Sequence, residues 1–139
     1  MKDQDLKNVP EEYWKEKLTS EQFKILREKG TEAPFSGDLL EENRDGMFVC
    51  GACGTALFKS ETKYESTLPG LLGWPSFSDA VSNEAIELRK DKSYGMDRVE
   101  VICATCGSHL GHIFDDPSSP TGQHYCINSV SLNFKPEES

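Results

Sequence analysis

The sequence predicts a mainly β (α+β) protein, with short N-terminal helices and an antiparallel β core that contains a metal site. Helical patterns are confined to the first 37 residues. From Gly46 onward, short apolar runs alternate with Gly, Pro, Asp, Asn and Ser, which is typical of antiparallel strands. Two Cys-x-x-Cys pairs have the spacing of metal ligands. A chain of 139 residues is expected to form one domain, 1–139.

Charge and hydropathy exclude several classes of partner. The net charge of −9 argues against nucleic acid, because phosphate binding requires a cationic surface. No segment approaches the roughly 20 apolar residues of a membrane span, and the charged start 1–8 is not a secretory signal. Five cysteines without an export signal favour a reducing compartment. We expect a cytoplasmic protein, and a monomer, because no exposed apolar seam is evident.

Two short helices are expected in an N-terminal arm, 1–37. The first would cover Pro10 to Leu18, with Pro10 at N1 and two glutamates close to the positive end of the helix dipole. A capping box from Thr19 to Gln22 begins the second helix, and Gly30 is expected to end it as C′. This arm is interpreted as a scaffold that packs on the later sheet.

Strands are expected throughout a β core, 46–135, with a turn at 91–96. In the run from Arg98 to Cys103, the residues Val99, Val101 and Cys103 alternate with more polar positions, so one face is apolar. The expected strands are 47–50, 55–60, 85–90, 98–103 and 125–134.

Two Cys-x-x-Cys-Gly motifs, at 50–54 and 103–107, predict one structural zinc ion per chain. Two intervening residues let both thiolates of a pair reach one ion, and the following glycine permits the turn. Four thiolates suit tetrahedral zinc and leave no position open for catalysis. Because the pairs lie far apart in the sequence, zinc would join distant parts of the β core. Redox-active pairs or buried free thiols are the alternatives.

Cys126 has no partner cysteine in the sequence. A lone cysteine on a strand is usually a small buried hydrophobe. On a regular strand, however, His124 and Asn128 would share a face with Cys126, and a reactive thiol needs polar neighbours of this kind. Cys126 is therefore a candidate nucleophile.

His109 and His112 are three residues apart, so a straight strand would direct them to opposite faces. Gly111 could introduce a bulge or bend that brings both to one site. Upstream, Trp74 precedes a proline that keeps it extended. Trp74 is either a core residue or an aromatic wall for an apolar group such as a methyl next to sulfur.

Taken together, these motifs resemble the methionine-R-sulfoxide reductases of the B type over nearly the whole chain, including an N-terminal region at 18–37. The motifs that carry the resemblance are Cys-x-x-Cys-Gly-x-x-Leu-Phe at 50–58, Gly-Trp-Pro-Ser-Phe at 73–77, Cys-x-x-Cys-Gly at 103–107, Ser-His-Leu-Gly-His-Ile-Phe at 108–114, Pro-Thr-Gly at 120–122 and Tyr-Cys-Ile-Asn-Ser-x-Ser-Leu-x-Phe at 125–134.

The resemblance implies two antiparallel sheets and a specific set of site residues. Cys126 would attack the sulfoxide sulfur of methionine-R-sulfoxide in oxidised proteins or peptides, which yields methionine and a cysteine sulfenic acid. His112 would donate or relay a proton, and His109 would bind water or the substrate oxygen. The other implied catalytic residues are Asp116 and Asn128, the substrate-binding residues are Trp74, Phe77 and His124, and the zinc ligands are Cys50, Cys53, Cys103 and Cys106.

Two positions depart from the family pattern. Leu72 stands where many members have a resolving cysteine, so the sulfenic acid is expected to be reduced by an external thiol such as thioredoxin, glutaredoxin or a small dithiol. His124 stands where the family usually has arginine, and histidine is largely neutral at neutral pH. Two other readings stay open, a zinc-stabilised binding module with an inert Cys126 and a zinc hydrolase with an open site completed by a histidine.

Overall fold

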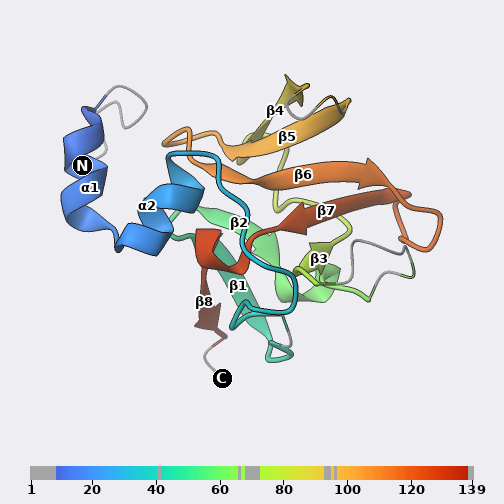
Figure 1. Cartoon of the computed structure of the whole chain (residues 1–139). Coiled ribbons are helices and arrows are strands. Elements are labelled where there is room, and N and C mark those ends of the chain that lie inside the picture. The colour runs from blue at the N-terminus through green and yellow to red at the C-terminus, as the bar shows by residue number, and fades with distance from the viewer. Residues whose placement is uncertain are drawn as a thin grey trace.

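The computed structural model describes residues 9–40, 42–65, 67, 73–92, 95 and 97–137, and it contains two antiparallel sheets and two short helices (Figure 1). The predicted fold class is confirmed. One sheet has the order β2-β1-β8 and the other has the order β3-β7-β6-β5-β4. The elements are α1 Glu11–Lys17, α2 Ser20–Leu26, β1 Gly46–Cys50, β2 Ala56–Lys59, η1 Ser60–Thr62, β3 Ser76–Phe77, β4 Ile86–Asp91, β5 Arg98–Cys103, β6 His109–Asp115, β7 Gln123–Ile127, η3 Ser129–Ser131 and β8 Leu132–Pro136.

The helix boundaries follow local capping interactions. The capping box is confirmed, since Thr19 Oγ1 accepts from the Gln22 N–H at 3.1 Å and Gln22 Oε1 accepts from the Thr19 N–H at 2.9 Å. Pro10 is the N-cap of α1 and not N1, because its ψ of 149° is extended. Gly30 is not the C′ residue of α2 either. The left-handed conformation falls on Lys29, with φ 58°, and the Gly30 N–H donates to the Lys24 carbonyl.

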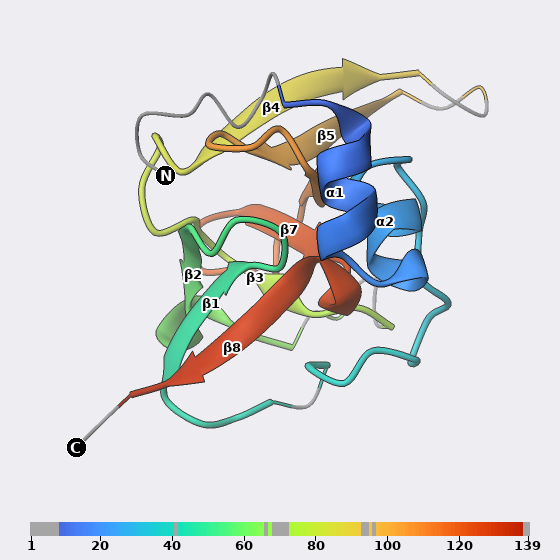
Figure 2. The same ribbon diagram turned by 90° about the vertical axis from the view of Figure 1, so that its left-hand side faces the viewer.

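Aromatic rings fill the space between the two sheets. Phe48 of β1 lies 4.9 Å from Phe134 of β8 and 5.0 Å from Phe77 of β3, measured between ring centroids. Phe58 of β2 stacks on Phe77 at 4.5 Å. Each such buried ring stabilises the fold by roughly 1.5–3 kcal/mol. Figure 2 shows β8 beside β1 and both helices on one side of these strands.

The predicted strand 125–134 is wrong as one strand. The 3-10 turn η3 interrupts it, so β7 belongs to the five-stranded sheet and β8 to the three-stranded sheet. Ser129 Oγ accepts from the Leu39 N–H at 2.8 Å, and Ser131 Oγ donates to the His109 carbonyl at 3.0 Å. The two serine hydroxyl groups of η3 are thus hydrogen-bonded by partners far away in the sequence. Without such partners, these buried polar groups would be unsatisfied in the core.

Strands β3 and β6 were not predicted as strands, but the bend expected near Gly111 is present. In the β5–β6 pairing, Val101 faces Gly111 and Ile102 faces His109, so Leu110 is an extra residue. Because of this bulge, the rings of His109 and His112 lie on one side, 5.5 Å apart. A side chain at position 111 would collide with the Cys126 carbonyl, so this close approach requires glycine.

Some expectations cannot be placed on this structure. Leu72 and residues 93, 94 and 96 of the predicted turn 91–96 fall outside the described residues, and Asp91 itself ends β4. Within the described part of the chain, every helix is too short or too polar to cross a bilayer.

Candidate active site and metal site

The two Cys-x-x-Cys-Gly turns meet, and their four sulfur atoms lie within 4.8 Å of one another. Cys50 Sγ is 3.7 Å from Cys106 Sγ, and Cys53 Sγ is 3.6 Å from Cys103 Sγ. Zinc–sulfur bonds of about 2.3 Å in a tetrahedron place sulfur atoms about 3.8 Å apart, so the cluster has the size that one ion needs. The four cysteines could therefore hold one metal ion.

Matching backbone turns bring the sulfurs together. In the first turn the Gly54 N–H donates to the Cys50 carbonyl at 2.9 Å, and in the second the Gly107 N–H donates to the Cys103 carbonyl at 2.8 Å. Gly54 and Gly107 have φ values of 84° and 77°, which non-glycine residues rarely adopt. The glycine after each pair thus performs the role that the sequence predicted.

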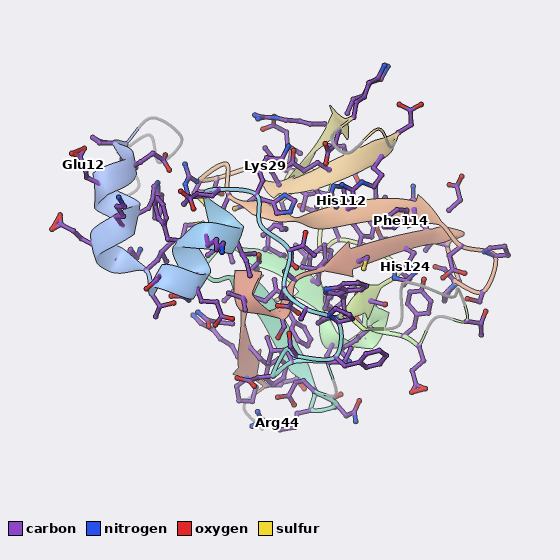
Figure 3. All side chains as sticks on the ribbon, viewed as in Figure 1. Glu12, Lys29, Arg44, His112, Phe114 and His124 are labelled. Atoms are coloured by element: carbon purple, nitrogen blue, oxygen red, sulfur yellow. The ribbon has the colours of Figure 1, made fainter. Side chains whose placement is uncertain are left out.

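A cavity of about 150 Å³ opens on the face shared by β6 and β7. Such a volume resembles that of cavities that admit one small apolar molecule. His112 and Cys126 are direct cross-strand partners here, and two positions further along the strands Phe114 faces His124. Figure 3 labels His112, Phe114 and His124 on these two strands. The cavity is lined by Thr31, Trp74, Arg98, Gly111, His112, Phe114, Cys126 and Asn128.

The Cys126 thiol is mostly buried and therefore protonated at neutral pH. Burial, reinforced by the negative charge of Glu32, raises the pKa of this thiol to about 12. The sequence had suggested polar neighbours that favour the thiolate. The surroundings of this thiol in the structure instead disfavour the thiolate.

His112 is held by the carboxylate of the last residue of β4. Its Nε2 lies 2.7 Å from Asp91 Oδ2, and Arg98 Nη2 lies 3.6 Å from the same oxygen. Burial lowers the pKa of His112, and the contact with Asp91 offsets this only in part. The neutral ring then donates from Nε2 to Asp91, which leaves Nδ1 as an acceptor.

His109 lies beside His112 in an adjoining depression of about 510 Å³. Its Nδ1 is 2.7 Å from Glu100 Oε2, and Lys29 Nζ is 3.3 Å from Glu100 Oε1. Burial opposes ionisation of Glu100, but His109 and Lys29 lower its pKa. Among the described residues, His109 Nε2 is buried without a hydrogen-bond partner, and His109 does not line the Cys126 cavity.

Trp74 and Asn128 are both attached to the backbone of Glu32. The Trp74 Nε1–H donates to the Glu32 carbonyl at 3.0 Å, and the Glu32 N–H donates to Asn128 Oδ1 at 3.0 Å. Asn128 Nδ2 also donates to the Leu110 carbonyl. These bonds fix the indole and the amide around the Cys126 cavity.

Three residues assigned to the site by resemblance lie elsewhere. Phe77 is fully buried in the core, stacked on Phe58, because it points to the inner side of β3. His124 and Asp116 form a separate buried pair, with Nδ1 to Oδ2 at 3.1 Å, and the Tyr64 hydroxyl also donates to Asp116 at 2.7 Å. None of these three side chains lines the Cys126 cavity.

Sequence reasoning missed three buried carboxylates, those of Asp91, Glu100 and Glu32. Asp91 had been placed in a turn, and Glu100 on the polar face of its strand. Only the pairing of β4 with β5, and of β5 with β6, brings Asp91 and Glu100 to the histidines. An acid in the middle of an apolar strand, as in Val99-Glu100-Val101, was the available signal.

A buried thiol in an aromatic-walled cavity, beside carboxylate-bound histidines and a separate four-cysteine cluster, defines the class of a thiol-based oxidoreductase. Residues 18–136 match the family model described as the SelR domain. The chain belongs to this family, that of the B-type methionine sulfoxide reductases.

The similar proteins carry consistent names. A peptide methionine sulfoxide reductase MsrB of Methanosarcina barkeri is 56% identical over 92% of this chain and 87% of its own length. One of Leptospira interrogans is 51% identical over 94% of this chain and 96% of its own. The mitochondrial methionine-R-sulfoxide reductase B3 of mouse is 52% identical over 90% of this chain and 48% of its own.

Proposed function

We propose that the protein reduces methionine-R-sulfoxide in peptides and proteins to methionine, with Cys126 as the nucleophile. The observation that carries this proposal is the position of the Cys126 thiol in a cavity also lined by Trp74, His112 and Asn128. Family membership supports the same reaction, since relatives are named for peptide methionine sulfoxide or methionine-R-sulfoxide reduction.

In the first step, the Cys126 sulfur attacks the sulfoxide sulfur and forms a transient sulfur–sulfur bond. This bond and the sulfur–oxygen bond of the substrate break as the oxygen passes to the Cys126 sulfur. The oxygen and the thiol proton end on Cys126 as a sulfenic acid, and methionine leaves. Sulfoxide is reduced and cysteine is oxidised, so the step balances without another reactant.

His112 is proposed to move the proton. Because the resting thiol is protonated, its proton must leave sulfur as the attack proceeds, and the sulfoxide oxygen must gain one. The cross-strand position of His112 puts an imidazole beside Cys126, and Asp91 holds the tautomer that can accept at Nδ1. Asp91 thus acts as a positioning residue.

Trp74 and Asn128 are proposed to select the epimer. The half-buried indole offers an apolar surface to the S-methyl group, while His112 and the Asn128 amide lie on the polar side. With the methyl group against Trp74, only one configuration at sulfur directs its oxygen to the polar groups. His109, whose buried Nε2 has no hydrogen-bond partner among the described residues, would bind water or the substrate oxygen.

An external thiol is proposed to regenerate the enzyme. Two external thiols reduce the Cys126 sulfenic acid to the thiol, which forms their disulfide and one water. The other four cysteines of the chain are those of the cluster, so none remains to resolve Cys126. Thioredoxin, glutaredoxin or a small dithiol would supply the electrons, and the free cysteines suit a reducing cytoplasm.

The four-cysteine cluster is proposed to hold one structural zinc ion. Four thiolates at tetrahedral spacing fit zinc and leave no open coordination position. The ion would supply cross-linking of the fold, and no step of the reaction passes through it. We also propose that the chain acts as one domain, 1–139, and as a monomer.

The test uses R and S epimers of one methionine-sulfoxide peptide with dithiothreitol, and it compares wild type with Cys126→Ser. We expect reduction of the R epimer alone, abolished in Cys126→Ser although metal content is unchanged. If metal-loaded wild type reduced neither epimer, the protein would instead be a zinc-stabilised binding module. Activity retained in Cys126→Ser would remove Cys126 as the nucleophile.

A further inference from the structure

The segment Thr31–Ser36 borders the Cys126 cavity and is firmly anchored to it. Thr31 lines the cavity, and the backbone of Glu32 holds both Trp74 and Asn128. The Glu32 carboxylate also accepts from the Val130 N–H at 2.8 Å. The backbone that leads to Phe35 is therefore fixed relative to the site.

Phe35 occupies a turn position that suits glycine or asparagine. The Ser36 N–H donates to the Ala33 carbonyl at 3.3 Å, Pro34 is the second residue of the turn, and Phe35 is the third with φ 64°. This is the arrangement of a type II turn, whose third residue must adopt positive φ. A bulky aromatic residue is strained there.

Contacts with the Trp74 motif maintain this strained turn. The Phe35 N–H donates to the Gly73 carbonyl at 2.8 Å. Pro34 packs so closely on Gly73 that a side chain at position 73 would collide with it. Phe35 does not line the cavity itself, but its backbone is bonded to Gly73, the residue that precedes the cavity-lining Trp74.

The Phe35 side chain gains no burial from its position. Its exposed fraction is 69%, and Leu88, at 50%, is the other large hydrophobic residue classed as exposed in the described part of the chain. A strained backbone that presents an apolar ring to solvent does not stabilise the fold. Strained backbone positions of this kind cluster at active sites and ligand-contacting segments.

We propose that Phe35 binds an apolar side chain of the substrate polypeptide, adjacent in sequence to the oxidised methionine. This inference rests on the proposed function, in which the cavity admits the methionine sulfoxide side chain. The polypeptide on either side must then lie on the surface around the cavity, and the exposed Phe35 ring is held close to Trp74 by the bond to Gly73. The enzyme consequently favours oxidised methionines that have apolar neighbours, such as those of unfolded core segments.

The test compares two peptides of equal length in which methionine-R-sulfoxide lies between two valines or between two serines. N-acetyl-methionine-R-sulfoxide, which has no neighbouring residues, is the internal reference, and dithiothreitol is the reductant. Wild type should prefer the valine peptide by about five- to tenfold in kcat/KM, mainly through KM, as partial burial of valine against a ring allows.

The variants are Phe35→Asn and Phe35→Gly, because both residues accept positive φ. Each should reduce the preference to near parity, while Tm stays the same or rises because strain is relieved. Leu88→Ala, which also removes an exposed apolar side chain, should keep the wild-type preference.

Three results would overturn the inference. The first is a preference retained in both Phe35 variants, and the second is a Tm that falls in both, which would make Phe35 a structural residue. The third is a wild-type enzyme that reduces all three substrates without preference. A wild-type enzyme that reduces none of them would instead overturn the proposed function, and this inference with it.

Discussion

The acidity of Cys126 depends on a residue almost a hundred positions earlier in the chain. The carboxylate of Glu32 contributes, after burial, to the raised pKa of the thiol. Glu32→Gln should keep the bond from the Val130 N–H, since glutamine Oε1 can accept it, but removes the charge. The pKa of Cys126 should then fall below its value of about 12.

Alkylation of Cys126 by iodoacetamide as a function of pH, followed on its peptide by mass spectrometry, measures this pKa. The titration of Glu32→Gln should lie at lower pH than that of wild type. Glu28→Gln is the matched control, because Glu28 is an exposed acid in the same region. Superimposable curves for Glu32→Gln and wild type would show that the Glu32 charge does not act on the thiol.

At the residue scale, motifs predicted the groups that surround the cavity better than the groups that support them. Trp74, His112 and Cys126 were named from their motifs, and the structure gathers them around one cavity. Asp91 and Glu100 were not, because their contacts with the histidines depend on the register of the β4–β5 and β5–β6 pairings. Their contacts with the two histidines are evident only in the folded sheet.

At the element scale, Arg27 connects the end of α2 to the second cysteine turn. Its Nη1 donates to the Cys106 carbonyl at 2.9 Å and to Ser108 Oγ at 3.0 Å, and its guanidinium lies 5.1 Å from the Trp14 ring centroid. Arg27→Ala should therefore reduce the free energy of unfolding by about 1–3 kcal/mol, as measured by urea denaturation.

Arg44→Ala is the matched control. Arg44 donates hydrogen bonds to the Glu42 carboxylate, and its guanidinium lies 5.1 Å from the Phe134 ring centroid. Its side chain, however, is 66% exposed. Because solvent screens the ion pair of Arg44 with Glu42, Arg44→Ala should have nearly the same free energy of unfolding as wild type. An equal decrease in the free energy of unfolding in Arg27→Ala and Arg44→Ala would contradict a specific role for Arg27 at the cysteine turn.

Local signals predicted the elements whose partners are close in sequence. The Thr19 to Gln22 capping box and the glycines of the cysteine turns are of this kind. The break between β7 and β8 was missed, because the polar groups of η3 find partners at Leu39 and His109, far away in the sequence. The alternation of side chains between two faces along 125–134 predicts one continuous strand, because those distant partners are not visible in the sequence.

At the scale of the whole molecule, the cysteine cluster connects the two sheets. Cys50 ends β1 of the three-stranded sheet, and Cys103 ends β5 of the five-stranded sheet.

Removal of the proposed zinc ion by a chelator should lower Tm by about 10 °C or more, because metal affinity contributes to folding free energy. Metal analysis should find one zinc per chain before treatment, and a metal-free protein with unchanged Tm would contradict a structural role.

The pH dependence of stability should reflect two buried histidines. Burial lowers the pKa of His112 and of His124 below the ordinary value of 6.5. The folded protein then binds fewer protons than the unfolded chain, so their stabilising effect is present above 6.5 and is lost as pH falls below it. Tm should decrease between about pH 7 and 5.5.

His124→Gln tests the contribution of one of these groups. Glutamine can still donate to Asp116 but does not titrate, so the decrease in Tm with falling pH should be smaller than in wild type. Calorimetry across this pH range measures the slope for both proteins. An identical slope would mean that His124 does not couple protonation to folding.

The most direct test of the account is a single turnover without reductant. Wild type is mixed with one equivalent of a methionine-R-sulfoxide peptide, trapped with dimedone and analysed by mass spectrometry. We predict one methionine per chain and one trapped sulfenic acid on Cys126, with no intramolecular disulfide. Methionine formed without modification of Cys126, or a disulfide from Cys126 to a cysteine of the cluster, would contradict the account.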